Sequence, residues 1–397
     1  MAKILCVWEL GEDLGHLAQF SVVSKELLSR GHEVYFAARD LSRSDSFFPE
    51  QQVCLLQAPV WQPRLKKPMK TRTFSEILLY QGFQSKASLQ PLVSAWRNLF
   101  TLISPDLVIF DYAPAALVAA INFSFKKVIL SNSFTTLPVG SDSKDLQSWE
   151  SDPTYDLTRS EFYITNVINE VLANYNTPEI GKISDIFRSD LVMLTCFRDI
   201  DFYRSHRHQA VYIGCLPGVS QFKAPSWAAS VHPKVFAYLK YGKDKVAMVI
   251  NVLQRLPVNA LCFYAGASRE ECIALSRDAF RVSNEPFNID AVLNEAGYVV
   301  THAGMGIVNQ ALYHGCPMLV VPTQLEQINT AILLEEMQVA LSVKSRDTET
   351  DIEEKIISLI QNFKYLRCAS EFSVNNELLS PQKSLKVVGD LCEDLLQ

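Results

Sequence analysis

Short apolar runs alternate along the chain with longer segments in which apolar residues recur at helical spacing. The runs have the length of strands and contain few polar residues, which is the pattern of parallel strands covered on both faces. In the first half of the chain we expect strands at residues 4–8, 33–38, 104–112, 127–131, 191–196 and 211–214. In the second half we expect them at residues 235–239, 259–265, 280–282, 298–301 and 318–321.

Helical spacing is clearest after the first strand, where apolar residues at Leu17, Phe20, Val23 and Leu27 predict a helix that ends near Ser29. Residues 74–100 predict long helical segments, interrupted around Gly82 and Pro91, whereas residues 40–58 have no clear pattern. Three amphipathic helices are expected at the C-terminal end, at residues 352–363, 366–378 and 381–396. Strands that alternate with helices in this way predict an α/β fold with parallel sheets.

The length of 397 residues exceeds what one hydrophobic core usually serves, so the chain predicts two domains. We expect an N-terminal domain at residues 1–215 and a C-terminal domain at residues 232–380. Residues 216–231 contain Pro217, Gly218 and Pro225 and are the expected linker. The helix at 381–397 is expected to pack back on the first domain.

Charge and cysteine content narrow the possible partners and the compartment. Because 43 acidic residues outnumber 37 basic ones, for a net charge of −6, nucleic acid is not expected as a partner. The nine cysteines form no C-x-x-C pair and no metal-ligand spacing, which indicates a reducing cytoplasm and no bound metal. The N-terminal MAKILCVWEL is too short for a signal peptide, and no apolar stretch reaches the ~20 residues of a membrane span. We therefore expect a cytoplasmic protein.

Residues 298–343 contain the strongest functional signal. An apolar strand at 298–301 is followed by the turn His302-Ala303-Gly304-Met305-Gly306 and by a helix that runs to about His314. The glycines let a ligand approach the backbone, and the first N–H groups of the helix point at the turn. The stretch therefore predicts an anion site, with diphosphate as the best fit. The alternative is an ordinary strand–helix–strand unit whose glycines only make a tight turn.

This stretch resembles the donor-binding region of GT-B glycosyltransferases of the UDP-glycosyltransferase type, a family that includes bacterial macrolide, rhamnosyl and flavonoid enzymes. The family pattern T-H-x-G-x-G-S…E-A-L…G-x-P-x-x-x-x-P…D-Q…N-A is matched at Thr301, His302, Gly304, Gly306, Ala311, Leu312, Gly315, Pro317, Pro322, Gln327 and Asn329. The resemblance implies two Rossmann-like domains that face each other across a cleft.

The same resemblance implies the donor contacts. His302, Gly304 and Gly306 would hold the diphosphate, and Asn309 belongs to the same set. Two positions depart from the pattern. The ribose-binding Glu of the family is Gln310 here, which lacks a carboxylate for a bidentate diol contact, so UDP and dTDP both stay open. The sugar-binding Asp-Gln pair is Glu326-Gln327, which keeps the charge and adds one methylene.

The N-terminal unit also resembles the family, whose pattern there is G-H-x-x-P…L-x-x-R-G-H-x-V, with Gln19 where proline is common. The resemblance makes His16 the catalytic base, since a neutral imidazole can take the proton of an attacking hydroxyl. Asp111, at the end of a parallel strand, would orient this imidazole. The alternatives are that His16 only starts a helix and that Asp111 is the N-cap of a helix at 113–122.

The segment from Arg64 to Arg72 has five basic residues and cannot be a regular helix or a central strand, because it contains Pro68 and follows Pro63. It could contact an anionic acceptor or a membrane surface, or it could be a solvated loop.

The resemblance implies a metal-independent, inverting glycosyltransferase that moves a hexose or deoxyhexose from a UDP- or dTDP-sugar to a hydroxyl of a small molecule or lipid. It implies no cofactor, because the nucleotide-sugar donor is a co-substrate. Three alternatives are kept: a non-hydrolysing nucleotide-sugar epimerase, a non-catalytic sugar-nucleotide-binding homologue, and a lipid-directed enzyme that docks through residues 64–72.

Overall fold

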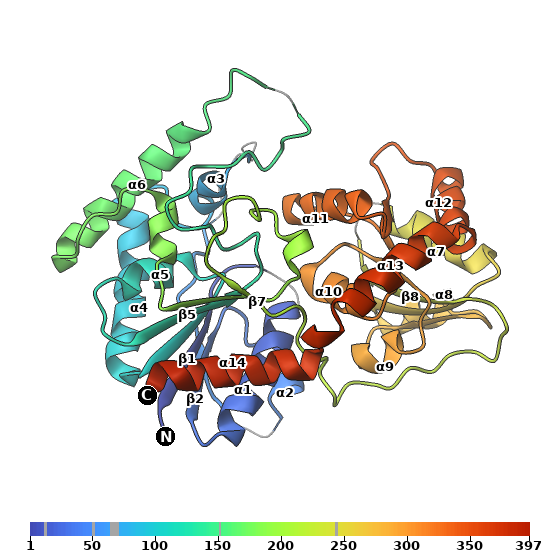
Figure 1. The fold of residues 1–397 in the computed structure, drawn as a ribbon, viewed down its shortest axis with the longest axis horizontal. Helices are drawn as coiled ribbons and strands as arrows, with labels where there is room; N and C mark the ends of the chain where they lie inside the picture. Colours follow the sequence, from blue (N-terminus) through green and yellow to red (C-terminus); the bar gives the residue numbers. More distant parts are fainter. Residues whose placement is uncertain (12–13, 50–51, 64–70, 151, 243–244) are drawn as a thin grey trace. The chain divides into compact units, whose positions relative to one another are not determined.

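The computed structural model describes residues 1–11, 14–49, 52–63, 71–150, 152–242 and 245–397 (Figure 1). They form two compact units. The first consists of Met1–Thr195, Tyr203–Ile213 and Leu385–Gln397, and the second of Cys196–Phe202 and Gly214–Ser384. The linker expected at 216–231 thus belongs to the second unit. So does the segment 196–202, because the Phe197 N–H donates to Asn309 Oδ1 and the Phe197 ring packs edge-on against Phe372.

The first unit is built on one parallel seven-stranded sheet in the order β3-β2-β1-β4-β5-β6-β7. Its strands are β1 (Lys3–Trp8), β2 (Glu33–Ala38), β3 (Cys54–Gln57), β4 (Leu107–Asp111), β5 (Lys126–Ser131), β6 (Leu191–Leu194) and β7 (Val211–Tyr212). The strand order reverses direction between β1 and β4, and in sheets of this kind ligands bind at the carboxyl ends of the strands beside that reversal.

Helices cover both faces of this sheet, with α4 and α5 on one face and α1 on the other (Figure 1). The helices and 3₁₀ turns are α1 (Gly15–Ser29), α2 (Ser44–Phe47), α3 (Phe74–Leu79), α4 (Lys86–Ile103), α5 (Pro114–Ala120), α6 (Thr158–Leu172), η1 (Ala173–Tyr175), η2 (Ile183–Phe187) and α14 (Pro381–Leu396), of which the residues from Leu385 onward belong to this unit. The C-terminal part of α14 is tied to α1, since Arg30 lies 2.8 Å from Asp390 and 2.7 Å from Glu393.

Two local expectations were wrong in this unit. Residues 40–58, in which no clear pattern was found, contain β3, a four-residue edge strand whose residues are all at least partly exposed. Pro91 does not interrupt a helix but lies inside α4, which continues to Ile103. The helix tolerates it because Leu89, Leu92, Val93 and Trp96 bury the apolar face on both sides of the proline.

The second unit is built on a parallel six-stranded sheet in the order β10-β9-β8-β11-β12-β13. Its strands are β8 (Lys234–Lys240), β9 (Asn259–Ala265), β10 (Phe280–Ser283), β11 (Tyr298–Thr301), β12 (Met318–Val320) and β13 (Ala340–Ser342). Its helices and 3₁₀ turns are η3 (Arg198–Ile200), α7 (Val246–Arg255), α8 (Arg269–Leu275), α9 (Ile289–Leu293), α10 (Met305–Tyr313), α11 (Leu325–Glu336), α12 (Glu349–Gln361), α13 (Phe363–Asn375) and η4 (Glu377–Leu379).

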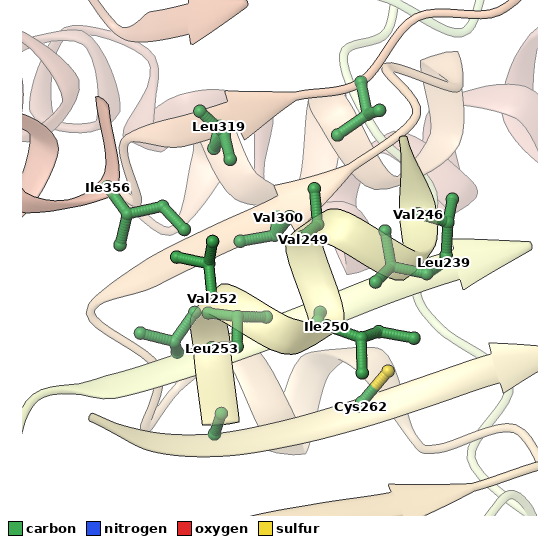
Figure 2. Packing of buried hydrophobic residues seen from close by; sticks show 14 of the residues in the cluster. Leu239, Val246, Val249, Ile250, Val252, Leu253, Cys262, Val300, Leu319 and Ile356 are labelled. Atoms are coloured by element: carbon green, nitrogen blue, oxygen red, sulfur yellow. The ribbon is translucent and has the colours of Figure 1, made fainter. Parts of the chain in front are cut away.

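The core of the second unit forms where α7 packs on this sheet (Figure 2). Val249 and Leu253 lie four residues apart on one face of α7, and they pack with Val300 of β11, Leu319 of β12 and Ile356 of α12. Truncation of such a buried leucine to alanine typically costs ~2–5 kcal/mol, so this layer holds β11 and β12 firmly in place. Within the described ranges, no helix combines the length and the apolar character needed to cross a bilayer.

Candidate active site

His16 and Asp111 form a close pair at the carboxyl edge of the first sheet. Asp111 is the last residue of β4 and lies in register with Trp8, the last residue of β1, while His16 lies in the first turn of α1. His16 Nδ1 is 2.6 Å from Asp111 Oδ2. The carboxylate is buried, whereas 16% of the His16 side chain is exposed, so the ring reaches the surface of the unit and the carboxylate does not.

Two further donors bind the Asp111 carboxylate. Gln19 Nε2 donates to Oδ2 over 3.0 Å, and Ser131 Oγ donates to Oδ1 over 2.6 Å. A carboxylate accepts hydrogen bonds only, so the His16 nitrogen that faces it carries the hydrogen. The neutral imidazole therefore has its hydrogen on Nδ1 and its basic lone pair on Nε2, which is the tautomer that a general base requires.

Packing holds the imidazole in place. The rings of His16 and Trp8 stack, with centroids 5.1 Å apart and planes inclined by 19°. On the Nε2 side lies Gly11, whose φ is +90°, and a Cβ there would be 2.6 Å from Nε2. Only glycine leaves the ring this position. Sequence reasoning missed Trp8, Gly11 and Ser131, since strand ends and loop glycines give no signal that they meet a histidine.

Asp111 is not a helix cap. The N-cap of α5 is Ala113, which makes no side-chain hydrogen bond. Instead, the first free N–H groups of α5 are bound by the buried Glu9, whose carboxylate oxygens accept from Ala115 N at 3.3 Å and Ala116 N at 3.0 Å. Burial raises the pKa of Glu9 to about 8, although these hydrogen bonds oppose the shift. The alternative role for Asp111 is therefore wrong, because another acid occupies that helix end.

The glycines of the turn in the second unit are needed for space and not for conformation. Gly304 is the N-cap of α10 with φ −65°, and Gly306 lies in the first turn, so neither backbone excludes alanine. A Cβ built on either would meet no atom of the described residues within 4 Å. No described side chain caps α10, so its first N–H groups face this open space. The strained residue is Ala303, with φ +64°, which sets the direction of the turn.

Both ring nitrogens of His302 are hydrogen-bonded to the backbone. Its Nε2 accepts from the Lys240 N–H at 2.9 Å, and its Nδ1 lies 2.8 Å from Val321 O, to which it donates. A ring nitrogen that accepts an N–H carries no proton, so this imidazole is neutral. In the free protein His302 ties the turn to the ends of β8 and β12, and its expected contact with a diphosphate stays a prediction.

Asn309 and Gln310 follow on α10 and differ from each other. Asn309 is fully buried, its amide donating to Met305 O and its oxygen accepting from Phe197 N, so its expected contact with the donor stays a prediction. Gln310 donates from Nε2 to Leu216 O. Gln310 Oε1 is buried, and among the described residues it has no hydrogen-bond partner. A buried acceptor without a partner is costly, so this oxygen indicates a ligand or a water molecule.

Glu326 and Gln327 lie in the first turn of α11, as the resemblance places them after Pro322. Gln327 Oε1 accepts from both Thr323 N at 2.8 Å and Thr323 Oγ1 at 3.1 Å, so this amide orders the loop that precedes the helix and presents its NH₂ as a donor. Within the described part of the chain, no group of three or more His, Cys, Asp or Glu side chains is arranged to hold a metal ion.

Most of the basic segment at 64–72 lies outside the described residues, since residues 64–70 are not among them. Arg72 is described and is buried. Its guanidinium forms an ion pair with Asp145 and lies 5.0 Å from the centre of the Tyr155 ring. At this position the expectation of a cation that faces an acceptor or a membrane is wrong, because the Arg72 charge is paired with Asp145 inside the unit.

Comparison with known proteins adds independent evidence. Residues 278–379 match the family described as glycosyltransferase family 28 C-terminal domain. No curated protein matches the chain. Solved structures match over essentially the whole chain. The glycotransferase of kitacinnamycin has a TM-score of 0.73 and 18% identity, and covers 100% of this chain and 99% of that one.

Two further solved structures are similar. The spinosyn rhamnosyltransferase SpnG gives a TM-score of 0.69 at 14% identity, with 100% of this chain and 99% of that chain covered. It has also been solved with spinosyn aglycone and with thymidine diphosphate. The glycosyltransferase VinC, in complex with dTDP, gives a TM-score of 0.67 at 15% identity, with 99% of each chain covered. The fold predicted from sequence is confirmed: the chain has two parallel-sheet α/β domains of the GT-B type and carries a glycosyltransferase domain.

Proposed function

We propose that this GT-B protein is a metal-independent, inverting glycosyltransferase that moves a hexose or deoxyhexose from a UDP- or dTDP-sugar to a hydroxyl of a small molecule or lipid. The observation that carries the proposal is the 2.6 Å contact between His16 Nδ1 and Asp111 Oδ2 at the carboxyl edge of the first sheet. It presents a partly exposed imidazole with Nε2 as its basic nitrogen, in a chain that carries a glycosyltransferase domain.

His16 acts as the general base in this proposal. As the acceptor oxygen attacks the anomeric carbon, its proton moves to His16 Nε2, and the bond from that carbon to the diphosphate oxygen breaks with its electron pair leaving on the diphosphate. The resulting imidazolium is stabilised by Asp111, which keeps its hydrogen bond to Nδ1 and does not take the proton. Because the acceptor displaces the diphosphate in one step, the configuration of the anomeric carbon inverts.

The turn at Gly304–Gly306 and the start of α10 bind the diphosphate. The uncapped N–H groups and the positive end of the helix dipole stabilise the charge that develops on the leaving group. This is the support for metal independence, since the oriented amides supply at this point what a cation would supply. Addition of EDTA is expected to leave the transfer rate unchanged.

The sugar of the nucleotide is placed near Gln310. With Nε2 committed to Leu216 O, this side chain offers one acceptor, Oε1, and so can bind one hydroxyl where a carboxylate could bind the two of a ribose. A 2′-deoxyribose has no second hydroxyl to leave unpaired. That two of the similar solved proteins bind thymidine diphosphate agrees with a dTDP-sugar as donor.

The test is a panel of UDP- and dTDP-sugars, read first by thermal shift. A donor at a hundred times its Kd stabilises the fold by ~2.7 kcal/mol, which is easily measured. Donors that bind are then incubated with a panel of hydroxylated acceptors, and product is followed by mass spectrometry for the wild type and His16→Ala. The proposal expects transfer by the wild type and its loss in the variant. Equal transfer by both would contradict the role of His16.

Incubation with donor alone separates the closest alternative. An epimerase would convert the sugar of the donor without any acceptor, whereas the proposed transferase would leave it unchanged apart from slow hydrolysis.

A further inference from the structure

Three hydrogen-bond donors converge on the Asp111 carboxylate, and only one of them comes from the proposed base. His16 Nδ1 and Gln19 Nε2 both bind Oδ2, at 2.6 Å and 3.0 Å, and Ser131 Oγ binds Oδ1 at 2.6 Å. Both carboxylate oxygens are therefore fixed from outside the His16–Asp111 pair. A carboxylate with only the histidine as partner could rotate about its Cβ–Cγ bond and present either oxygen.

Gln19 is placed for this role by the helix. It lies three residues after His16 on α1, so the two side chains are neighbours on one helix face and reach the same carboxylate oxygen. Both hydrogens of its amide are used, because Nε2 also donates 2.9 Å to Leu130 O of β5. The side chain thus links α1 to the ends of β4 and β5.

Ser131 acts from the other side. It is the last residue of β5, fully buried, and its Oγ lies 2.8 Å from Thr135 Oγ1 in addition to Asp111 Oδ1. Ser131 can give its hydrogen to the carboxylate and accept from Thr135, whose single hydroxyl hydrogen has Asn132 Oδ1, at 3.1 Å, as its other acceptor. The Asp111 carboxylate is thus bonded to a buried side chain on this side as well.

We infer that Gln19 and Ser131 are positioning residues that hold the Asp111 carboxylate with Oδ2 facing His16 Nδ1. The inference rests on the proposed function, since it assigns them the task of keeping the base in its working tautomer. Neither residue touches a reacting atom. When the acceptor proton arrives at Nε2, the Nδ1–H bond to Oδ2 must already be formed, and a carboxylate fixed at both oxygens does not have to reorganise at that moment.

The experiment uses substitutions that remove the donors and preserve the volume. Gln19→Met has no N–H groups but similar length and good helix propensity, and Ser131→Ala removes only the hydroxyl. Gln90→Met is the matched control, since Gln90 is a helical glutamine of the same unit whose Nε2 also donates twice, to Ser94 Oγ and Tyr175 OH. Ser131→Thr is the control for Ser131→Ala, since threonine keeps a hydroxyl at this position.

Two readouts are taken on each folded variant. The first is the far-downfield proton resonance of the His16 Nδ1–H, assigned by its absence in His16→Gln, which reports the bond to Asp111 without any turnover. The second is the separation of kcat from KM. For Gln19→Met and Ser131→Ala we expect the resonance to move upfield and to exchange faster with water, and kcat to fall ~10-fold with the donor KM unchanged. Gln90→Met should change neither, and Ser131→Thr should recover both.

An unchanged resonance in Gln19→Met and Ser131→Ala would overturn the inference, whatever the rates, because the carboxylate would then hold its place without them. An altered resonance with unchanged kcat would overturn it too, because the positioning would have no catalytic consequence. A wild-type protein without transferase activity would instead count against the proposed function. The His16 Nδ1–H resonance of the variants would still show whether Gln19 and Ser131 hold the Asp111 carboxylate in place.

Discussion

The two histidines that follow parallel strands, His16 after β1 and His302 after β11, are held by different partners, and the partners decide what each ring can do. His16 Nδ1 faces a buried carboxylate, so a proton arriving at Nε2 creates a charge that is already compensated. His302 bonds with both ring nitrogens to backbone groups, Lys240 N and Val321 O, and neither of these two groups carries a charge. The same residue type is thus suited to proton transfer in one unit and to holding a turn in the other.

The largest effect should come from breaking the first pair. His16→Ala removes the base, and kcat is expected to fall by ~10²–10⁴-fold with donor affinity unchanged. Asp111→Asn offers an amide N–H to Nδ1 and so favours the wrong tautomer, with a loss of similar size. Steady-state kinetics with saturating donor measure both. Loss of donor binding in His16→Ala would show that the ring belongs to the donor site instead.

Substitution of Gly11 gives the next test, because it changes the position of the His16 ring and leaves the chemistry of the ring intact. A Cβ at Gly11 would lie 2.6 Å from His16 Nε2, so Gly11→Ala must displace the imidazole, and misplacement on the scale of 1 Å can cost ~10²-fold in rate. Gly15→Ala is the matched control, since a Cβ at Gly15 meets no atom within 4 Å in the part of the chain that the structure describes. Equal kcat for the two variants would mean that the ring position does not matter.

In the second unit, substitution of a glycine by alanine should leave the stability of the free protein intact and remove donor binding. Gly306→Ala adds a Cβ where the structure has room, so the free protein should be as stable as the wild type or more stable by ~0.5–1 kcal/mol, since alanine is the better helix former. The added methyl would occupy the space assigned to the diphosphate. Thermal melting should therefore show an unchanged or raised Tm and no further rise when a donor is added. A full donor-induced rise would contradict the assignment.

The smallest expected effect concerns the choice of nucleotide. Gln310→Glu replaces the single free acceptor by a carboxylate that can bind both hydroxyls of a ribose, so the ratio of UDP affinity to dTDP affinity should rise by about tenfold. Competition between the two nucleotides measures the ratio directly. An unchanged ratio would show that Gln310 does not contact the nucleotide sugar.

Much of the fold could be predicted because buried parallel strands are apolar runs, so that 33–38, 259–265 and 298–301 coincide with β2, β9 and β11. The half-exposed edge strand β3 was missed because its apolar run, residues 53–56, is only four residues long and lies in a segment of mixed composition. Pairing of His16 with Asp111 was expected from the resemblance, and the structure brings the two together.

What could not be predicted depends on contacts between distant residues. Gln19 and Ser131 meet Asp111 across intervals of 92 and 20 residues, and no local pattern shows that they share one carboxylate. The neutral state of His302 depends on the backbone N–H of Lys240, which every residue except proline would supply, so its sequence carries no signal. Glu9, and not Asp111, accepts from the first free amides of α5, and no local pattern in the sequence shows this contact across more than 100 residues.

The account assigns proton transfer to the first unit and nucleotide binding to the second. Calorimetric titration of dTDP and UDP into the wild type, His16→Ala and Gly306→Ala under identical conditions tests this assignment most directly. We predict that the wild type and His16→Ala bind the preferred nucleotide with the same Kd, whereas Gly306→Ala binds it at least ~10-fold more weakly. Weakened binding in His16→Ala together with wild-type binding in Gly306→Ala would contradict the account.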